Sequence, residues 1–291
     1  MKLMTFEKQG KQIVGVVDKS ETKVADINSL GLSAAYPSMD ALIEHVTPAD
    51  MEKLRSYAAG KASAGQEYPL QDVKFLPPIP RPRHDVLCLG TNFHDVVKKT
   101  GMAPLKDPIF FGKRAAKMTG HNGTLDGVLD IDEQFDYELE LCVVIGKEGY
   151  RIPPEKVEEH IFGYSVFDDY TSRGVQARCG QWYQGKGGDT LSAMGPWIVT
   201  KDELPITKNF ILTLRVNGEV RQHSGTDDFI FDLKTGISKF SETITLEPGD
   251  IIATGTPFGC ACNVEPRRWL KSGDKVENEI EGIGVMVNWV K

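Results

Sequence analysis

Apolar and polar residues alternate in short segments along the first part of this chain. Two segments have the two-residue period of strands and two have the wider spacing of helices, at residues 12–18, 23–27, 39–46 and 48–59. A proline-rich passage at residues 77–82 then excludes a helix or a central strand and is typical of an extended linker. The pattern predicts a small N-terminal α/β domain over residues 1–75 and a larger domain over residues 76–291.

Beyond the linker, short apolar runs rich in β-branched residues are separated by Gly, Pro, Asn and Asp. The runs lie at residues 86–89, 138–145, 164–167, 197–200, 210–216, 251–254 and 284–290. Helical stretches between them are few. The pattern predicts a mostly β core of mixed sheets, and therefore an α+β fold for the whole chain.

The composition narrows the classes of function. With a formal net charge of -7, the chain offers no basic surface that would gather nucleic acid, so we expect no nucleic-acid partner. No apolar run approaches the roughly 20 residues that span a bilayer, so we expect no membrane segment and a cytoplasmic location. Cys88 and Cys142 lie in apolar runs and suit reduced core thiols. Cys260 and Cys262 form a C-x-C without a second pair at zinc spacing, which favours free loop thiols over a zinc site.

Residues 135–146 carry the strongest chemical signal, with the sequence FDYELELCVVIG. In a strand, residues two apart share a face, so Glu138 and Glu140 project together while Tyr137 and Leu139 project to the other side. Two carboxylates side by side at the start of an apolar strand repel each other, and a cation between them resolves the conflict. An edge strand with its glutamate face in solvent is the structural alternative.

A second strand, at residues 163–169, ends on two aspartates before a helix expected to start at Thr171 or Ser172. Asp168 or Asp169 supplies a third carboxylate, unless these residues serve as helix caps. Three acidic oxygens completed by water suit a hard ion such as Mg²⁺ or Mn²⁺. The absence of His or Cys at ligand spacing argues against zinc.

Two glycine-rich segments can approach a ligand closely. Lys186 lies among glycines, where its ammonium can meet a carboxylate or phosphate oxygen, and a solvated turn lysine is the alternative. The strand, loop and helix pattern of a P-loop is missing around it. Residues 253–259 follow an apolar strand and offer backbone N–H groups and hydroxyls that can hold an anion, although Gly-Thr-Pro turns are common.

Taken in order, these segments resemble the fumarylacetoacetate hydrolase (FAH) superfamily in its bacterial short-chain form. The similarity runs from about Leu87 to the end of the sequence. It rests on motifs at residues 90–93, 137–140, 163–173, 185–190, 195–199 and 248–257. The resemblance implies a β-roll core, a homodimer and one Mg²⁺, Mn²⁺ or Ca²⁺ per subunit.

The same resemblance assigns roles to single residues. It places the metal on Glu138, Glu140 and Asp169. The residues that it assigns to catalysis or to holding the substrate and the metal shell are Arg173, Gln176, Lys186, Thr190 and Thr256. Gly255, in the loop after the apolar strand, and Lys113, at the end of a segment that lines the site in relatives, are expected to contact the substrate as well.

In that superfamily a 2-oxo acid chelates the metal through a carboxylate and a keto oxygen. Cleavage at C3, decarboxylation and tautomerisation all place enolate charge on the keto oxygen, where the metal acts as a Lewis acid. The resemblance therefore implies a divalent-metal-dependent enzyme that acts on a small 2-oxo or diketo acid through a metal-bound enolate. Acylpyruvate-type carbon–carbon hydrolysis is the leading hypothesis.

One departure from the superfamily's pattern concerns the general base. Hydrolytic relatives read G-x-N-Y-x-x-H-x-x-E, where the His and Glu activate water. Gly90, Asn92 and Phe93 fit that pattern, but Val96 and Lys99 occupy the positions of the His and the Glu. The usual hydrolytic pair is therefore missing.

Two histidines remain as candidate bases. His94 lies two positions before the expected one, about 200° around a helix, and is kept as a catalytic candidate. His121 is a weaker one. Without the pair, a 2-oxo acid decarboxylase, hydratase or isomerase and a non-catalytic metabolite binder stay open as alternatives. A purely structural role would not explain paired glutamates on a core strand. Separately, Arg267 and Arg268 could bind a second carboxylate of the substrate or be solvated, so a dicarboxylic substrate stays an open alternative.

Overall fold

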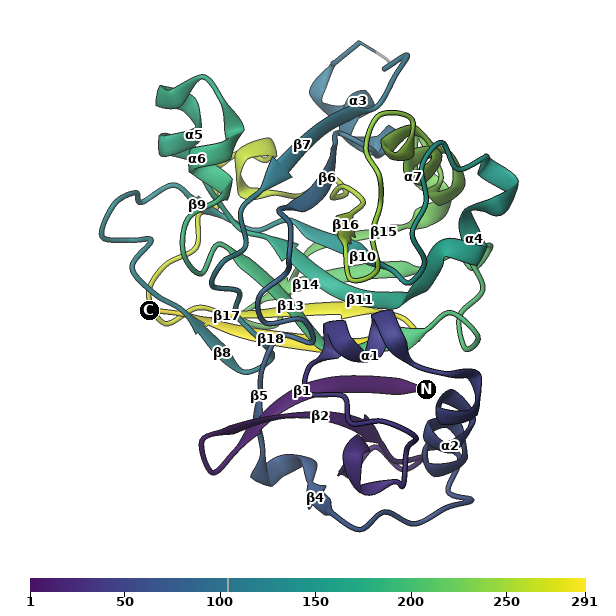
Figure 1. The fold of residues 1–291 in the computed structure, drawn as a ribbon. Helices are drawn as coiled ribbons and strands as arrows, with labels where there is room; N and C mark the ends of the chain where they lie inside the picture. The colour runs from purple at the N-terminus through teal and green to yellow at the C-terminus, as the bar shows by residue number, and fades with distance from the viewer. Residues whose placement is uncertain (104) are drawn as a thin grey trace.

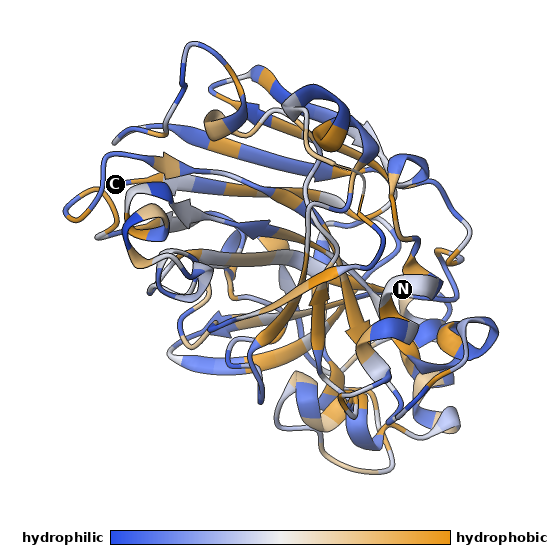
Figure 2. Ribbon diagram, turned by 90° about the horizontal axis from the view of Figure 1, so that it is seen from above, coloured by the Kyte–Doolittle hydropathy of each residue, from blue (hydrophilic) through white to orange (hydrophobic). Residues whose placement is uncertain are grey.

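The computed structural model describes residues 1–103 and 105–291 of the chain. Strands dominate, and they form two main sheets with short helices at their edges and ends (Figure 1). The class predicted from the sequence, a mostly β α+β fold of mixed sheets, is confirmed. Hydrophobic residues concentrate on the strands in the middle of the molecule, as Figure 2 shows.

The larger sheet extends through the whole molecule and has eleven strands in the described part of the chain. Ten follow one path, in the order β4 (Glu67–Pro69), β3 (Lys23–Asp26), β2 (Lys11–Val17), β1 (Lys2–Lys8), β13 (Ser192–Thr200), β11 (Ile161–Asp169), β10 (Leu139–Ile145), β16 (Ile251–Ala253), β6 (Val86–Gly90) and β7 (Ile109–Lys113). β5 (Lys74–Phe75) pairs with β1 beside this path. Because β1 pairs antiparallel with β13, the sheet continues from the N-terminal segment into the rest of the chain.

The second sheet packs beside the first and is smaller. Its strands lie in the order β15 (Glu219–Gly225), β14 (Ile211–Val216), β17 (Lys275–Ile280), β18 (Gly284–Val290) and β8 (Gly123–Leu125). A separate ribbon joins β9 (Phe135–Asp136) to β12 (Thr171–Ser172). This ribbon lies where β10 begins and β11 ends, and it ties those two strand ends together.

The helices are short and lie outside the sheets (Figure 1). The α-helices are α1 (Met39–His45), α2 (Pro48–Ala58), α3 (His94–Thr100), α4 (Val157–His160), α5 (Arg173–Cys179), α6 (Trp182–Lys186) and α7 (Leu233–Ser241). Single 3₁₀ turns occupy Ile27–Ser29, Leu70–Asp72, Pro154–Lys156, Thr226–Asp228 and Ala261–Asn263. No helix in residues 1–103 or 105–291 is both long and apolar enough to cross a membrane.

The two helices near the N-terminus begin where the sequence provides caps. The side chain of Ser38 accepts a hydrogen bond from the backbone N–H of Ala41, and that of Thr47 accepts one from Asp50. Pro48 opens α2, where its missing N–H costs no helix bond. Both helices therefore begin close to where the apolar spacing of the sequence predicted them, at residues 39 and 48.

Strand β10 is buried on both faces, and its alternation divides two apolar clusters. Leu139, Leu141 and Val143 pack into the cluster between the two sheets, whereas Cys142 and Val144 pack into the cluster on the other side. A strand flanked by β11 and β16 and covered on both faces reads as a continuous apolar run. The glutamates at its start are therefore held inside the protein.

Close packing between β11 and β13 gives a first prediction. A Cβ added at Gly163 would overlap the backbone oxygen of Val199 and come within 2.8 Å of the Ile198 Cγ2 atom. Gly163→Ala is expected to lower the free energy of unfolding by roughly 1–3 kcal/mol, the usual cost of overpacking. Urea denaturation measures it.

Gly112 on β7 provides the matched control, since the nearest atom to an added Cβ there is 3.8 Å away. Gly112→Ala is expected to change the unfolding free energy by less than about 1 kcal/mol, because it removes only the flexibility of a strand glycine. Equal destabilisation by the two variants would contradict this account of the packing.

Candidate active site

Three carboxylates meet at the end of β11 and the start of β10. Oxygen atoms of Glu138, Glu140 and Asp169 all lie within 4.8 Å of one another. All three residues are buried, with 8%, 2% and 0% of their surface exposed. The alternative of an edge strand with its glutamates in solvent is therefore wrong.

Backbone hydrogen bonds across the two strands fix this meeting. The N–H of Asp169 donates to the carbonyl of Glu138 at 2.9 Å, and the N–H of Glu138 donates to Asp168 Oδ1 at 2.8 Å. The two aspartates therefore point to opposite sides, and Asp169 alone joins the glutamates. Neither aspartate caps α5. The N–H groups of Gly174 and Val175 in its first turn donate instead to Asp132 Oδ2, in the loop before β9.

Lys186 closes the carboxylate cluster from α6. Its Nζ lies 2.6 Å from Glu138 Oε2 and 2.5 Å from Asp169 Oδ2. It also donates to Thr171 Oγ1 at 3.1 Å. With 3% of its surface exposed, Lys186 is not a solvated turn lysine. Burial would lower the pKa of Lys186, but the facing carboxylates of Asp169 and Glu138 outweigh it and raise this pKa, so the side chain is a fixed cation.

Arg173 holds the cluster from the first turn of α5. Its Nε donates to Asp136 Oδ2 at 2.8 Å, and one terminal nitrogen is paired with Glu138 Oε1. Its other terminal nitrogen donates to Gln176 Oε1 at 3.1 Å. Burial would raise the pKa of Glu138, but Arg173 and Lys186 outweigh it and lower that pKa to about 2.

Lys113 binds the cluster from the far side and does not line the cavity described below. Its Nζ is paired with Asp169 Oδ1 and donates to the carbonyls of Tyr170 at 3.0 Å and Leu191 at 2.7 Å. An ammonium group has three hydrogens, and these three partners use all of them. The structure therefore places Lys113, which the resemblance linked to substrate, where it positions Asp169.

These strand ends carry more buried negative charge than positive. The buried groups here comprise five carboxylates, of Asp136, Glu138, Glu140, Asp168 and Asp169, and three cations, of Lys113, Arg173 and Lys186, which leaves a formal surplus of two negative charges. Burial, with Asp169 and Glu138 nearby, raises the pKa of Glu140 well above its usual value. Burial also raises the pKa of Asp168 to about 8. A divalent cation among the carboxylates has the charge that this surplus requires.

The loop after β16 contributes backbone donors to the site. The N–H of Gly255 donates to Glu140 Oε2 at 2.7 Å. Gly255 has a φ of 93°, and a Cβ there would lie 2.8 Å from Asn92 Cβ, so this position needs glycine. The next residue, Thr256, lines the cavity.

A cavity of about 170 Å³ opens onto the carboxylates. Its polar wall is formed by Glu138, Glu140, Arg173, Gln176, Lys186 and Thr256. Apolar side chains of Leu89, Val96, Phe111 and Trp182 form much of the remainder. The volume is well below the roughly 300–1,000 Å³ of pockets that enclose drug-sized ligands, which suits a small acid.

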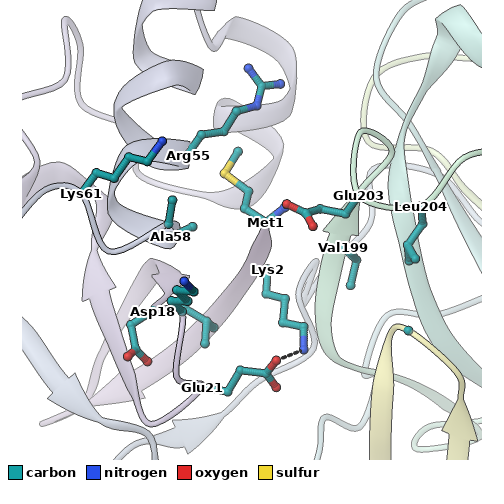
Figure 3. A pocket seen from close by; sticks show the side chains of 14 residues that line it. Met1, Lys2, Asp18, Glu21, Arg55, Ala58, Lys61, Val199, Glu203 and Leu204 are labelled. Atoms are coloured by element: carbon teal, nitrogen blue, oxygen red, sulfur yellow. Dashed lines mark hydrogen bonds and ion pairs between the residues drawn. The ribbon is translucent and has the colours of Figure 1, made fainter.

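A larger cavity of about 560 Å³ lies elsewhere, where the N-terminal segment meets the end of β13 (Figure 3). None of its lining residues lines the carboxylate cavity. Some of its charged groups are in ion pairs, Lys2 with Glu21 at 2.5 Å and Arg55 with Asp202 at 2.9 Å, and its acidic lining residues are not buried. The smaller cavity is therefore the candidate for chemistry.

Several other residues singled out in the sequence lie outside the cavity wall. His94 is exposed at the start of α3, and Thr190 donates to the carbonyl of Asp126 at 3.0 Å. His121 accepts from the N–H of Val287 at 3.2 Å, and burial lowers its pKa. The exposed or half-exposed Arg267 and Arg268 pair with Glu265 and Glu219. The cysteines of the C-x-C are free thiols, Cys260 buried and Cys262 in the cavity wall.

Asp136 is a site residue that the sequence reading missed. Its Oδ1 accepts from the N–H groups of Tyr137 at 2.9 Å and Ala261 at 2.7 Å, and its Oδ2 accepts from Cys262 at 3.1 Å as well as from Arg173. It therefore orients Arg173 and anchors the loop that carries Cys262. Its position two residues before Glu138 is the sequence feature that could have pointed to it.

Comparison with known proteins identifies the family of this chain. A family model described as fumarylacetoacetate (FAA) hydrolase, C-terminal, matches residues 85–291. The chain belongs to the fumarylacetoacetate hydrolase family. Enzymes of this family generally use a divalent metal ion, and the donor set found here, three buried carboxylates with a surplus of negative charge, fits one.

Three relatives show the range of chemistry in the family. The oxaloacetate tautomerase YisK of Bacillus subtilis is 35% identical over 301 residues, with 100% of both chains covered. The structure of a fumarylacetoacetate hydrolase from Exiguobacterium antarcticum has a TM-score of 0.84 at 32% identity, over 100% of this chain and 99% of that one. A 5-carboxymethyl-2-hydroxymuconate delta-isomerase from Mycobacterium smegmatis has a TM-score of 0.75 at 27% identity, with the same coverage. This chain is therefore a family enzyme whose relatives hydrolyse, isomerise or tautomerise small molecules.

Metal binding gives the second prediction. Glu140→Gln is expected to weaken Mn²⁺ binding at least about 100-fold, since even loss of an outer-shell partner costs roughly 10–100-fold. Calorimetric titration of the metal-stripped protein measures the affinity. Glu133→Gln removes an exposed carboxylate outside the cluster and is expected to leave the affinity unchanged. Equal Mn²⁺ affinities of the wild type and Glu140→Gln would show that the carboxylate cluster is not the metal site.

Proposed function

We propose that this enzyme is a divalent-metal-dependent tautomerase that interconverts the keto and enol forms of a small 2-oxo acid of the oxaloacetate class. The observation that carries this proposal is the apolar side chain of Val96 in the cavity wall, where hydrolytic relatives have a histidine. No histidine lines the carboxylate cavity among the described residues. The 35% identical relative named as an oxaloacetate tautomerase supports the same choice.

The surroundings of α3 show why the missing pair is not replaced locally. Lys99 lies over the ring of Phe258, 4.4 Å from its centre, and 3.7 Å from the carboxylate of Asp95. Asp95 in turn accepts from the N–H of Phe258 at 3.2 Å. These side chains fasten α3 to the loop after β16, and neither Asp95 nor Lys99 lines the cavity. In tautomerisation a base takes a proton from C3 and a proton is added to the keto oxygen, so no water attacks the substrate and no carbon–carbon bond breaks.

The residues of the chain divide the work of binding and charge stabilisation. Glu138, Glu140 and Asp169 would hold the divalent ion, which supplies a Lewis acid for the carboxylate and keto oxygens when bound. Lys186 and Arg173 pair with the two carboxylate oxygens of Glu138, one cation to each oxygen. The Lys186 ammonium lies 2.6 Å from Glu138 Oε2 in the cavity wall, where it would offer positive charge to the enolate oxygen.

Lys186 gives the third prediction. Lys186→Met is expected to lower kcat by roughly 100- to 1,000-fold, the usual loss for one well-placed electrostatic donor. Lys117→Met is the matched control, because Lys117 pairs with Asp189 on the surface and its side chain is 71% exposed. Circular dichroism verifies that both variants fold. A Lys186→Met enzyme within tenfold of the wild type would contradict the assigned role.

The experiment that tests the function compares 2-oxo acids with and without metal. Metal-stripped protein is incubated with oxaloacetate and a series of acylpyruvates, with and without Mg²⁺ or Mn²⁺, while enol absorbance and products are followed. We expect metal-dependent acceleration of the keto–enol interconversion of oxaloacetate, with the carbon skeleton intact. Failure to accelerate this interconversion would overturn the proposal.

Hydrolysis of an acylpyruvate is the second candidate, favoured by the likeness to the Exiguobacterium antarcticum hydrolase. Its signature in the same experiment is metal-dependent release of pyruvate and a carboxylic acid, and the base would then be sought outside the present cavity wall, with His94 tested first. Release of carbon dioxide would indicate decarboxylation. No change in enol absorbance and no product, together with tight metal binding, would indicate a metabolite binder. The homodimer, the cytoplasmic location and the choice of Mg²⁺ or Mn²⁺ stay predictions, which sedimentation, cell fractionation and metal analysis of the purified protein measure.

A further inference from the structure

Gln222, on β15 of the smaller sheet, connects two walls of the active site without lining the cavity. Only 1% of its surface is exposed. Its Oε1 accepts from the N–H of Leu139 at 3.1 Å. Its Nε2 donates to Thr256 Oγ1 at 2.8 Å and to the carbonyl of Pro257 at 2.7 Å. One side chain thus contacts both the glutamate strand and the loop after β16.

A β-bulge directs this side chain into the protein. Across β14 and β15, Leu214 pairs with Gln222 but Arg215 pairs with Val220. Arg221 is therefore an extra residue without a partner on β14. Such bulges bend a strand and re-aim a side chain, and they are common beside active sites.

The contact with Leu139 holds the strand that carries the metal-site glutamates. Leu139 lies between Glu138 and Glu140, and its side chain packs into the cluster between the sheets. Because its N–H is bonded to Gln222, the spacing of the two carboxylates depends on an amide from the other sheet. The N–H must face an oxygen and the carbonyl of Pro257 must face a nitrogen, so the orientation of the Gln222 amide is determined by its partners.

The contact with Thr256 determines what that hydroxyl can do. A threonine hydroxyl has one proton to donate and lone pairs to accept with. Since Gln222 donates to Thr256 Oγ1, the hydroxyl proton remains free for another partner. Thr256 lines the cavity, so an acidic substrate oxygen can be that partner.

We infer that Gln222 is a positioning residue, which keeps Thr256 as a hydrogen-bond donor to the substrate and holds the loop at its distance from Glu140. The inference rests on the proposed function in one respect, that the ligand is a 2-oxo acid. It adds a residue of the second sheet to a site otherwise built from the first sheet, helices α5 and α6, and the loop after β16. The effect of Gln222 on the substrate passes through Thr256, and a double-mutant cycle isolates such coupling.

The test combines Gln222→Met, Thr256→Val and the double variant on full-length, Mn²⁺-loaded protein. Two quantities are measured, namely kcat/KM for oxaloacetate and the affinity for oxalate, whose adjacent oxygens match the carboxylate and keto oxygens of a 2-oxo acid. Each single variant is expected to lose about 10- to 100-fold in both, the usual weight of a hydrogen bond to a charged group. The double variant is expected to be within about twofold of the worse single one. Mn²⁺ affinity is measured alongside and is expected to change by less than about tenfold.

Thr213→Val is the matched control, since Thr213 is a buried polar residue of neighbouring β14 whose hydroxyl contacts His223 at 3.0 Å, away from the site. It is expected to leave kcat/KM and oxalate affinity unchanged. If Gln222→Met does not fold, Gln222→Glu replaces it, because a glutamate keeps the acceptor for Leu139 but loses the donor to Thr256.

Two results would overturn the inference: unchanged oxalate affinity in the Gln222 variant, or losses that multiply in the double variant. An enzyme that binds oxalate with the expected coupling but does not turn over oxaloacetate would contradict the proposed function and leave the role of Gln222 supported. A wild-type protein that does not bind oxalate would overturn the inference.

Discussion

The burial of five carboxylates at the ends of two central strands is the constraint on which the site depends. Burying an ionised carboxylate costs free energy unless a cation pairs with it. The cationic partners here are Lys113, Arg173 and Lys186. The remaining surplus of negative charge is the physical basis for a divalent cation. Without a bound cation, burial raises the pKa values of Glu140 and Asp168, and these two carboxyl groups then favour their neutral forms.

The fold supplies the rigidity that this arrangement needs. Strands β10 and β11 are buried along their whole length, and the ribbon of β9 and β12 joins their ends. Positioned groups come from elements far apart in the sequence, since Lys113 belongs to β7, Arg173 to α5 and Gln222 to the second sheet. A rigid frame with cations on several sides suits stabilisation of the enolate charge that develops in the proposed reaction. In the proposed function, the apolar Val96 in the cavity wall favours proton transfer over hydrolysis.

Local patterns predicted much of the fold and the centre of the site. The two-residue period of a strand placed Glu138 and Glu140 on one face, and the cluster membership of Leu139 and Cys142 confirms the alternation. The wider spacing of apolar residues at 39–46 and 48–59 predicted α1 and α2, which begin at serine and threonine caps in the structure. Short elements such as α3 and α6 had no comparable signal, because one or two helical turns leave little periodicity to recognise.

Long-range contacts explain what the sequence could not predict. The partners of Lys113 lie 56, 57 and 78 residues away, so its role as a brace for Asp169 follows only from the folded chain. Gln222 is 83 residues from Leu139, and a bulge that only strand pairing reveals turns it inward. The measurement that tests the central claim most directly is anomalous X-ray scattering from crystals of the protein grown with Mn²⁺. The account predicts one strong peak among the carboxylate oxygens of Glu138, Glu140 and Asp169, and the absence of a peak at that position would contradict it.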